Sequence, residues 1–143
     1  MKKLICSISA LILSLAAAVS VFATTPTVYV DGEILSFDVE PFIEEDRTMV
    51  PMRAIFEAVG ASVMWDQETK TVISVKSSEA SQNVVVLQIG NANAFVNSQS
   101  VALDVPAKVI NDRTFVPLRF VMESLDADVQ WDPDTFTVTV TTK

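Results

Sequence analysis

The sequence is short of the residues that most catalytic and metal sites use. It has no histidine, and its one cysteine, Cys6, lies close to the N-terminus. Zinc and copper sites depend on His or Cys ligands, and Ser-His-Asp or Cys-His catalysis needs a histidine. We therefore expect residues 24–143 to hold no metal or cofactor and to have no enzyme activity. Without cysteine in that segment, core packing and not disulfides must stabilise the fold.

The first 23 residues are typical of a secretory signal peptide. Lys2 and Lys3 precede an uncharged stretch from Leu4 to Val21, and small side chains at Val21 and Ala23 suit a signal peptidase. A membrane anchor is the alternative, since such a stretch is just long enough to span a bilayer. Its content of Ala and Ser favours a signal cleaved after Ala23. We predict a protein that is secreted or associated with the cell envelope, without stable membrane insertion after cleavage.

The remaining chain is strongly acidic. The whole sequence has a net charge of −8, and removal of Lys2 and Lys3 with the signal changes this to −10. Such a surface repels nucleic-acid phosphates and anionic lipid head groups. We therefore expect no nucleic-acid partner.

The chain matches itself without a gap when it is shifted by 66 residues. The segment 46–53 (DRTMVPMR) becomes 112–119 (DRTFVPLR), and 14 of the 27 positions from 46 to 72 are identical to their counterparts. This predicts one domain over residues 24–143, built from two repeats at 28–75 and 94–141. The polar segment 77–83 is the predicted linker between them. Two units of this size bury little surface alone, so we expect a shared core.

Each repeat predicts strands around one short amphipathic helix. Pro51 and Pro117 suit the first helical position, and apolar residues recur after each at helical spacing. Gly60 ends the first helix as a left-handed cap, where the second has Asp126. Asp31-Gly32 predicts a hairpin turn. The predicted fold class is α+β, with each tandem repeat forming an antiparallel sheet packed on its own helix.

Two tryptophans follow the helices at equivalent positions. Trp65 alternates with Ala61 and Val63, and Trp131 follows the same pattern in the second repeat. This register favours core positions. A platform for stacking sugar rings is the alternative.

Four arginines are the candidate binding residues, two in each repeat close to the start of the predicted helix: Arg47, Arg53, Arg113 and Arg119. The structural interpretation is that they pair with Glu57, Glu123 or nearby aspartates, since Arg53 and Glu57 are spaced to meet across one helical turn. The functional interpretation is an anion or carboxylate site near each helix N-terminus.

Acidic residues gather in the turns, notably Asp126, Asp128, Asp132 and Asp134, and again in Glu44-Glu45-Asp46. Calcium sites use several such oxygens, but this spacing matches no calcium loop. A carboxylate pair can serve a glycosidase, but units of this size leave little room for a cleft. We interpret these residues as solvated turns.

The segments 112–121 (DRTFVPLRFV) and 127–132 (ADVQWD) resemble the copper amine oxidase N-terminal domain-like family, also called stalk domains. The pattern occurs twice and covers nearly all of residues 24–143. The resemblance implies an α+β fold and a non-catalytic accessory domain of the bacterial envelope or extracellular space. It does not imply the copper chemistry of the catalytic domain, which Tyr29 as the single tyrosine and the absence of histidine exclude. Glu44-Glu45 departs from the glycine-containing turn of such domains.

Two functional hypotheses remain open. One is a module that binds a cell-wall polysaccharide or a surface protein. The other is a structural stalk or self-association module, a homo-oligomer whose sheet edges pair. The apolar strand Val84–Ile89, if it lies at an edge, favours the second hypothesis.

Overall fold

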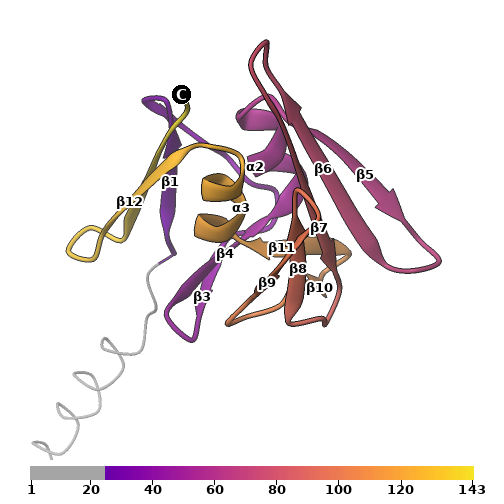
Figure 1. Cartoon of the computed structure of the whole chain (residues 1–143). Coiled ribbons are helices and arrows are strands. Elements are labelled where there is room, and N and C mark those ends of the chain that lie inside the picture. Colours follow the sequence, from indigo (N-terminus) through magenta and orange to yellow (C-terminus); the bar gives the residue numbers. More distant parts are fainter. Residues whose placement is uncertain (1–24) are drawn as a thin grey trace, which may run out of the picture.

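The computed structural model describes residues 25–143, so the predicted signal peptide at 1–23 lies outside the described residues. The described chain forms three sheets and two short helices, shown in Figure 1. No helix among these residues is long and apolar enough to cross a membrane.

Sheet A has the strand order β12-β13-β1-β2. These strands are Asp128–Asp132, Thr137–Thr141, Thr27–Val30 and Glu33–Ile34. Sheet B has the order β10-β11-β4-β3. Its strands are Lys108–Ile110, Arg113–Pro117, Arg47–Pro51 and Phe42–Glu44. Sheet C has the order β5-β6-β7-β8-β9. Its strands are Ser62–Asp66, Thr71–Ser77, Gln82–Gln88, Asn93–Val96 and Gln99–Ala102.

Helices α2 (Met52–Ala58) and α3 (Leu118–Ser124) lie at the centre of the molecule, between sheet A and sheet C (Figure 1). Their buried residues join apolar side chains of sheets A and C in one core, as the repeat pattern predicted. Val50 and Val116 bring one face of sheet B into this core. Met49 and Phe115, on the other face of sheet B, form a smaller cluster with Val105.

The C-terminal ends of both helices follow the sequence-based prediction. The amides of Gly60 and Ala61 donate to the carbonyls of Glu57 and Phe56, which is the Schellman arrangement, and Gly60 has φ 82°. Asp126 adopts the same left-handed conformation, with φ 64°. Pro51 and Pro117 differ slightly from expectation, since each is the last residue of a strand and the N-cap of the helix that follows.

Elements of the two halves begin 66 residues apart throughout. β1 begins at residue 27 and β8 at 93, α2 at 52 and α3 at 118, and β6 at 71 and β13 at 137. Residues 66 apart are called equivalent positions below. β7 has no equivalent strand among the described residues.

The sheets do not follow the predicted repeats, and the prediction that each repeat has its own antiparallel sheet is wrong. Sheet A joins β12 and β13 to β1 and β2 from the other half, and β1 pairs with β13 in parallel. In sheet B, β4 pairs with β11, with Val50 opposite its equivalent Val116. The described residues thus form one interleaved body.

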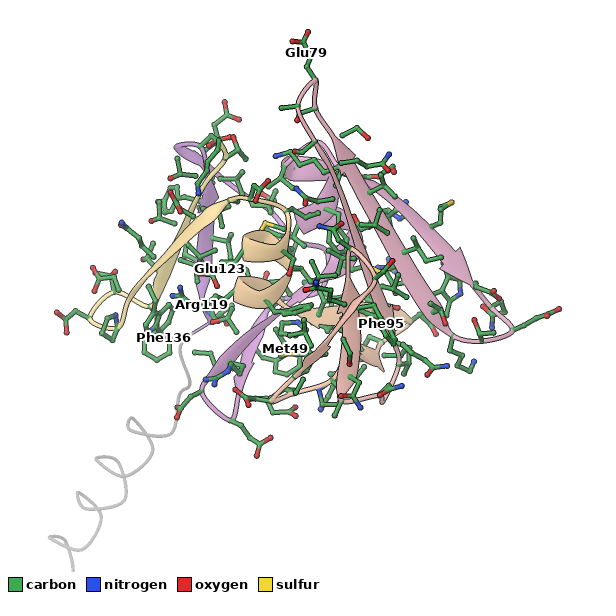
Figure 2. All side chains as sticks on the ribbon, in the orientation of Figure 1. Met49, Glu79, Phe95, Arg119, Glu123 and Phe136 are labelled. Carbon is green, nitrogen blue, oxygen red and sulfur yellow. The ribbon has the colours of Figure 1, made fainter. Side chains whose placement is uncertain are left out.

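Two further expectations need correction for the same reason. The segment 77–83 is the closed end of the β6–β7 hairpin and not a linker, since Ser77 pairs with Gln82 and only residues 78–81 form the turn. Glu79 lies at the tip of this hairpin in Figure 2. The predicted strand at Val84–Ile89 is present as β7, but β6 and β8 flank it on both sides. It therefore offers no free edge.

Candidate functional site

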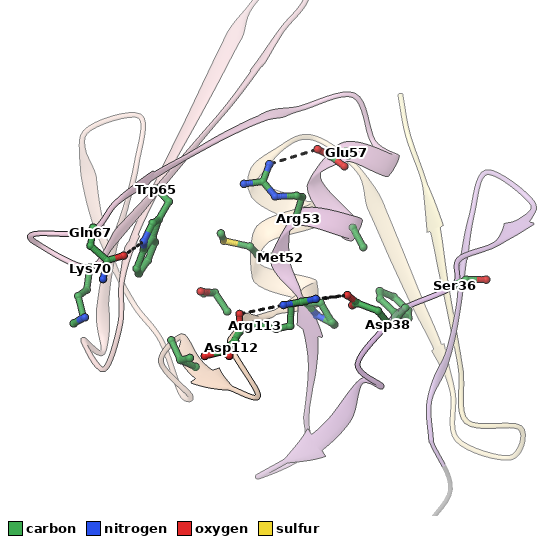
Figure 3. Close-up of a pocket in the computed structure, with 15 residues that line it drawn as sticks. Ser36, Asp38, Met52, Arg53, Glu57, Trp65, Gln67, Lys70, Asp112 and Arg113 are labelled. Carbon is green, nitrogen blue, oxygen red and sulfur yellow. Dashed lines mark hydrogen bonds and ion pairs between the residues drawn. The ribbon is translucent and has the colours of Figure 1, made fainter.

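A cleft with a volume of about 900 Å³ lies beside helix α2. We call it the α2 cleft, and Figure 3 shows its residues. Helix α2 contributes Arg53 and Glu57, β5 contributes Trp65, and the β10–β11 hairpin contributes Asp112 and Arg113. It is completed by Ser36, Phe37, Asp38, Pro51, Met52, Ala54, Gln67, Lys70, Val109 and Thr114. Both halves of the chain therefore form its walls.

A second cleft lies beside helix α3 and has a volume of about 460 Å³. We call it the α3 cleft. Most of its lining residues are equivalent to those of the α2 cleft: Arg119 to Arg53, Glu123 to Glu57, and Trp131 to Trp65. Figure 2 labels Arg119 and Glu123, both on helix α3. The two clefts are thus two versions of one arrangement.

All four predicted arginines line the clefts, in pairs drawn from opposite halves. Arg53 and Arg113 meet in the α2 cleft, while Arg47 and Arg119 meet in the α3 cleft. The sequence pointed to these four residues but not to which two share a cleft. Arg113 reaches the α2 cleft only through the contact of β11 with β4.

Each helix arginine pairs with the glutamate one turn later. Arg53 Nη1 lies 3.6 Å from Glu57 Oε2, and Arg119 Nη1 donates to Glu123 Oε2 at 3.2 Å. Arg119 also donates to the carbonyl of Val129 at 3.1 Å. The pairing predicted from the spacing of four residues is therefore present.

The strand arginines pair with aspartates of the other half. Arg113 donates from Nε and Nη2 to Asp38 Oδ2, at 2.9 and 2.6 Å, and its equivalent Arg47 pairs with Asp104. Asp38 and Asp104 are themselves equivalent positions. These two reciprocal ion pairs join the two halves of the chain, and their residues line the two clefts.

The Arg113 hydrogen bonds hold the pKa of the Asp38 carboxyl below its usual value, and Asp38 in turn raises the pKa of Arg113. Both groups are therefore charged at neutral pH.

Trp65 and Trp131 contact the core on one side and a cleft on the other. Each is half-buried and packs against the central core, as its register with Val63 or Val129 predicted. Each also lines a cleft, which the register did not predict. The indole Nε1 of Trp65 donates to Gln67 Oε1 at 2.8 Å. The Trp131 ring meets the Phe136 ring edge-on, with centroids 5.4 Å apart and planes at 62°.

Sequence reasoning missed Lys70 and Phe136, which occupy equivalent positions. Lys70 lines the α2 cleft, and Phe136 stands against the tryptophan of the α3 cleft. The 66-residue shift aligns the two, so the difference was present in the sequence as a mismatch between repeats.

Two of the acidic turn residues accept hydrogen bonds from other residues of the protein. Asp132 Oδ1 accepts from the amide of Asp134 at 2.9 Å, and Asp126 accepts from the side chain of Asn83. Within residues 25–143, no group of three or more His, Cys, Asp or Glu side chains is placed to hold a metal ion. The donor set does not fit copper, since the chain has no histidine and Cys6 lies outside these residues.

Comparison with models of protein families finds a match. The family model described as copper amine oxidase N-terminal domain matches residues 29–140. This range includes both helices, both clefts and nearly all strands. No curated protein matches the chain.

Proposed function

Because the chain belongs to the copper amine oxidase N-terminal domain family, which is a non-catalytic domain type, we propose that it is a binding module of the cell envelope. Its ligand in this proposal is a cell-wall polysaccharide, and the clefts are its binding sites. A surface protein is the competing ligand.

The two equivalent clefts carry this proposal. Each combines a tryptophan with two arginines and a glutamate, on walls held by ion pairs. The flat indole suits the apolar face of a sugar ring, and charged planar groups beside it suit hydroxyls and carboxylates. Equivalent sites in one body suit a ligand that repeats, because a second contact on the same chain raises the overall affinity.

The sequence supports the same setting. The predicted signal peptide at 1–23 directs the chain out of the cytoplasm, and the 66-residue spacing of elements supports two tandem copies of one unit. The net charge of −10 leaves neutral or sparsely charged polymers as the favoured partners.

The test is co-sedimentation of residues 24–143 with isolated cell walls, before and after removal of surface proteins or of polysaccharide. Binding should survive protein removal and disappear with the polysaccharide. The double variant Trp65→Phe/Trp131→Phe should bind more weakly, while Phe95→Ala, outside both clefts, should bind as the unchanged protein does. No binding to any wall fraction would overturn the proposal.

Self-association is the second candidate, and one face of sheet C favours it. The paired residues Met64, Ile73, Val86 and Phe95 form an apolar row across four strands. Met64 is 56% exposed and Phe95 is 45% exposed. The positions equivalent to Met64 and Ile73 are Gln130 and Thr139 in sheet A, so the fold itself does not require apolar residues there.

Sedimentation velocity over a range of protein concentrations tests this candidate. A concentration-dependent mass that Met64→Gln/Phe95→Gln abolishes would support a stalk that assembles through sheet C. A monomer at all concentrations would exclude it.

A further inference from the structure

The two clefts differ in the last residue of the turn next to the tryptophan, which is Lys70 in one and Phe136 in the other. Lys70 and Phe136 both have positive φ, 56° and 52°, so the equivalent turns place the two side chains alike. In the α3 cleft Phe136 packs edge-on against Trp131. In the described part of the chain, Trp65 has no aromatic neighbour of this kind, and Figure 3 shows Lys70 at the rim beside Gln67 and Trp65. No aromatic side chain of the described residues therefore competes with a ligand ring for the Trp65 indole.

The clefts also differ in charge. Arg47 and Arg119 of the α3 cleft each have a carboxylate partner, and so do Arg53 and Arg113 of the α2 cleft. Lys70 adds a further cation to the α2 cleft, and it makes no ion pair with any residue from 25 to 143. An ammonium without a carboxylate partner is ready to pair with a charged ligand.

The size of the α2 cleft fits a ligand with more than one ring. Its volume of about 900 Å³ is near the upper end of the range for small-molecule sites, and the α3 cleft has about half of that. Ser36, Gln67 and Thr114 add hydrogen-bonding groups to the α2 cleft. A stacking surface, polar groups and one free ammonium together match a sugar whose rings each carry one negative charge.

We propose that the α2 cleft is the one that selects a sugar carrying a carboxylate, with the ring against Trp65 and the carboxylate paired with the Lys70 ammonium, while the α3 cleft contacts uncharged parts of the same polymer. This rests on the proposed function and names the ligand class and the cleft. The net charge of −10 selects against densely charged polyphosphates. One carboxylate per ring can pair with the Lys70 ammonium in a cleft whose other charged residues are Asp38, Arg53, Glu57, Asp112 and Arg113.

The two tryptophans of the chain make the assignment measurable, because each reports on one cleft. Trp131→Phe leaves Trp65 as the only indole, and Trp65→Phe leaves Trp131. Each variant is titrated with trigalacturonate and with its methyl ester at low salt while indole fluorescence is followed. We expect a saturable change from Trp65 with the acid, a weaker affinity for the ester, and no saturable change from Trp131 with the acid.

Lys70 is tested in the Trp131→Phe background. Lys70→Gln should weaken binding of the acid about threefold, as for an exposed ion pair, and leave the affinity for the ester unchanged. Phe136→Lys in the Trp65→Phe background should make Trp131 respond to the acid, since it places the same cation in the α3 cleft. Far-UV circular dichroism checks that each variant is folded.

Three results would overturn the inference: equal affinity for acid and ester, the same response from both tryptophans, or no effect of Lys70→Gln. Wall co-sedimentation of the same proteins separates this failure from that of the proposed function. Wall binding without a response to trigalacturonate would reject the α2 cleft assignment and keep the wall module. A response of Trp65 without wall binding would reject the wall module and keep the site.

Discussion

At the scale of residues, left-handed backbone conformations mark the hairpin turns. Both central residues have positive φ in the turns Asp31-Gly32, Glu45-Asp46, Asn97-Ser98 and Asn111-Asp112. Two such residues make the type I′ turn, whose twist matches that of the flanking strands. Only the first of these turns contains a glycine. The others hold non-glycine residues in a conformation that costs each about 1 kcal/mol.

Ser98→Gly should stabilise the protein. Ser98 has φ 71° in an exposed turn outside both clefts, and the change creates Asn-Gly, the pair that type I′ turns prefer. We expect the free energy of unfolding to rise by about 0.5–1 kcal/mol in urea denaturation. The reverse change at the equivalent turn, Gly32→Ser, should lower it by a similar amount. An unchanged or lower stability of Ser98→Gly would show that the turn is not strained.

The ion pair between Arg113 and Asp38 should make stability depend on pH in the acid range. The folded-state pKa of Asp38 lies below its unfolded value of 3.8, because Arg113 donates hydrogen bonds to it. Its contribution is therefore complete well above pH 3.8 and is lost as the pH falls through the folded-state pKa. Urea denaturation between about pH 7 and pH 2 should show a smaller loss for Asp38→Asn than for the unchanged protein. Parallel curves would contradict this assignment.

At the scale of elements, the helices depend on the core and not on their own ends. Each has seven residues, has no side-chain cap at its N-terminus, and has no acidic residue in its first turn or basic residue in its last. Isolated helices of this length are unstable in water. Ile55 and Phe56 of α2 are fully buried, so tertiary packing holds the helix in place.

Phe56→Ala should therefore lower the free energy of unfolding by about 3–5 kcal/mol, through lost burial and the cavity that remains. Arg53→Ala on the exposed face of the same helix should cost about 0.5 kcal/mol, since its ion pair with Glu57 is solvated. Urea denaturation of the two variants measures both losses. Similar losses of stability for the two variants would mean that helix propensity, and not packing against the core, holds α2 in its helical form.

At the scale of the molecule, each sheet is assembled from both halves of the chain. Strands up to β6 and strands from β7 onward meet in sheets A, B and C alike. A chain divided in the β6–β7 turn would thus lose partners in every sheet. Neither half keeps a complete core of its own.

Fragments 24–79 and 80–143 test this interleaving. Each should be unfolded alone by circular dichroism, and a mixture should regain the sheet signal and elute as a one-to-one complex. The uncleaved chain is the control for both measurements. A fragment that folds independently as a monomer would contradict the interleaved assembly.

The sequence by itself determined the local structure of this protein. The hairpin at Asp31-Gly32, the helical stripes after Pro51 and Pro117, the cap at Gly60 and the strand β7 all follow from patterns within a few residues. The 66-residue offset likewise follows from the sequence, and so does the family. These features are readable because turn geometry, helix capping and the alternation of apolar residues act between near neighbours.

Only the tertiary structure decided which strands meet and what lines the clefts. The backbone hydrogen bonds of a sheet are the same for any sequence, so the apolar sequence of β7 does not determine whether this strand lies at an edge or in the middle of its sheet. Arg113 and Asp38 are 75 positions apart and meet because β11 pairs with β4. The same pairing brings Arg53 and Arg113 into one cleft with Trp65, since each cleft takes its walls from both halves of the chain.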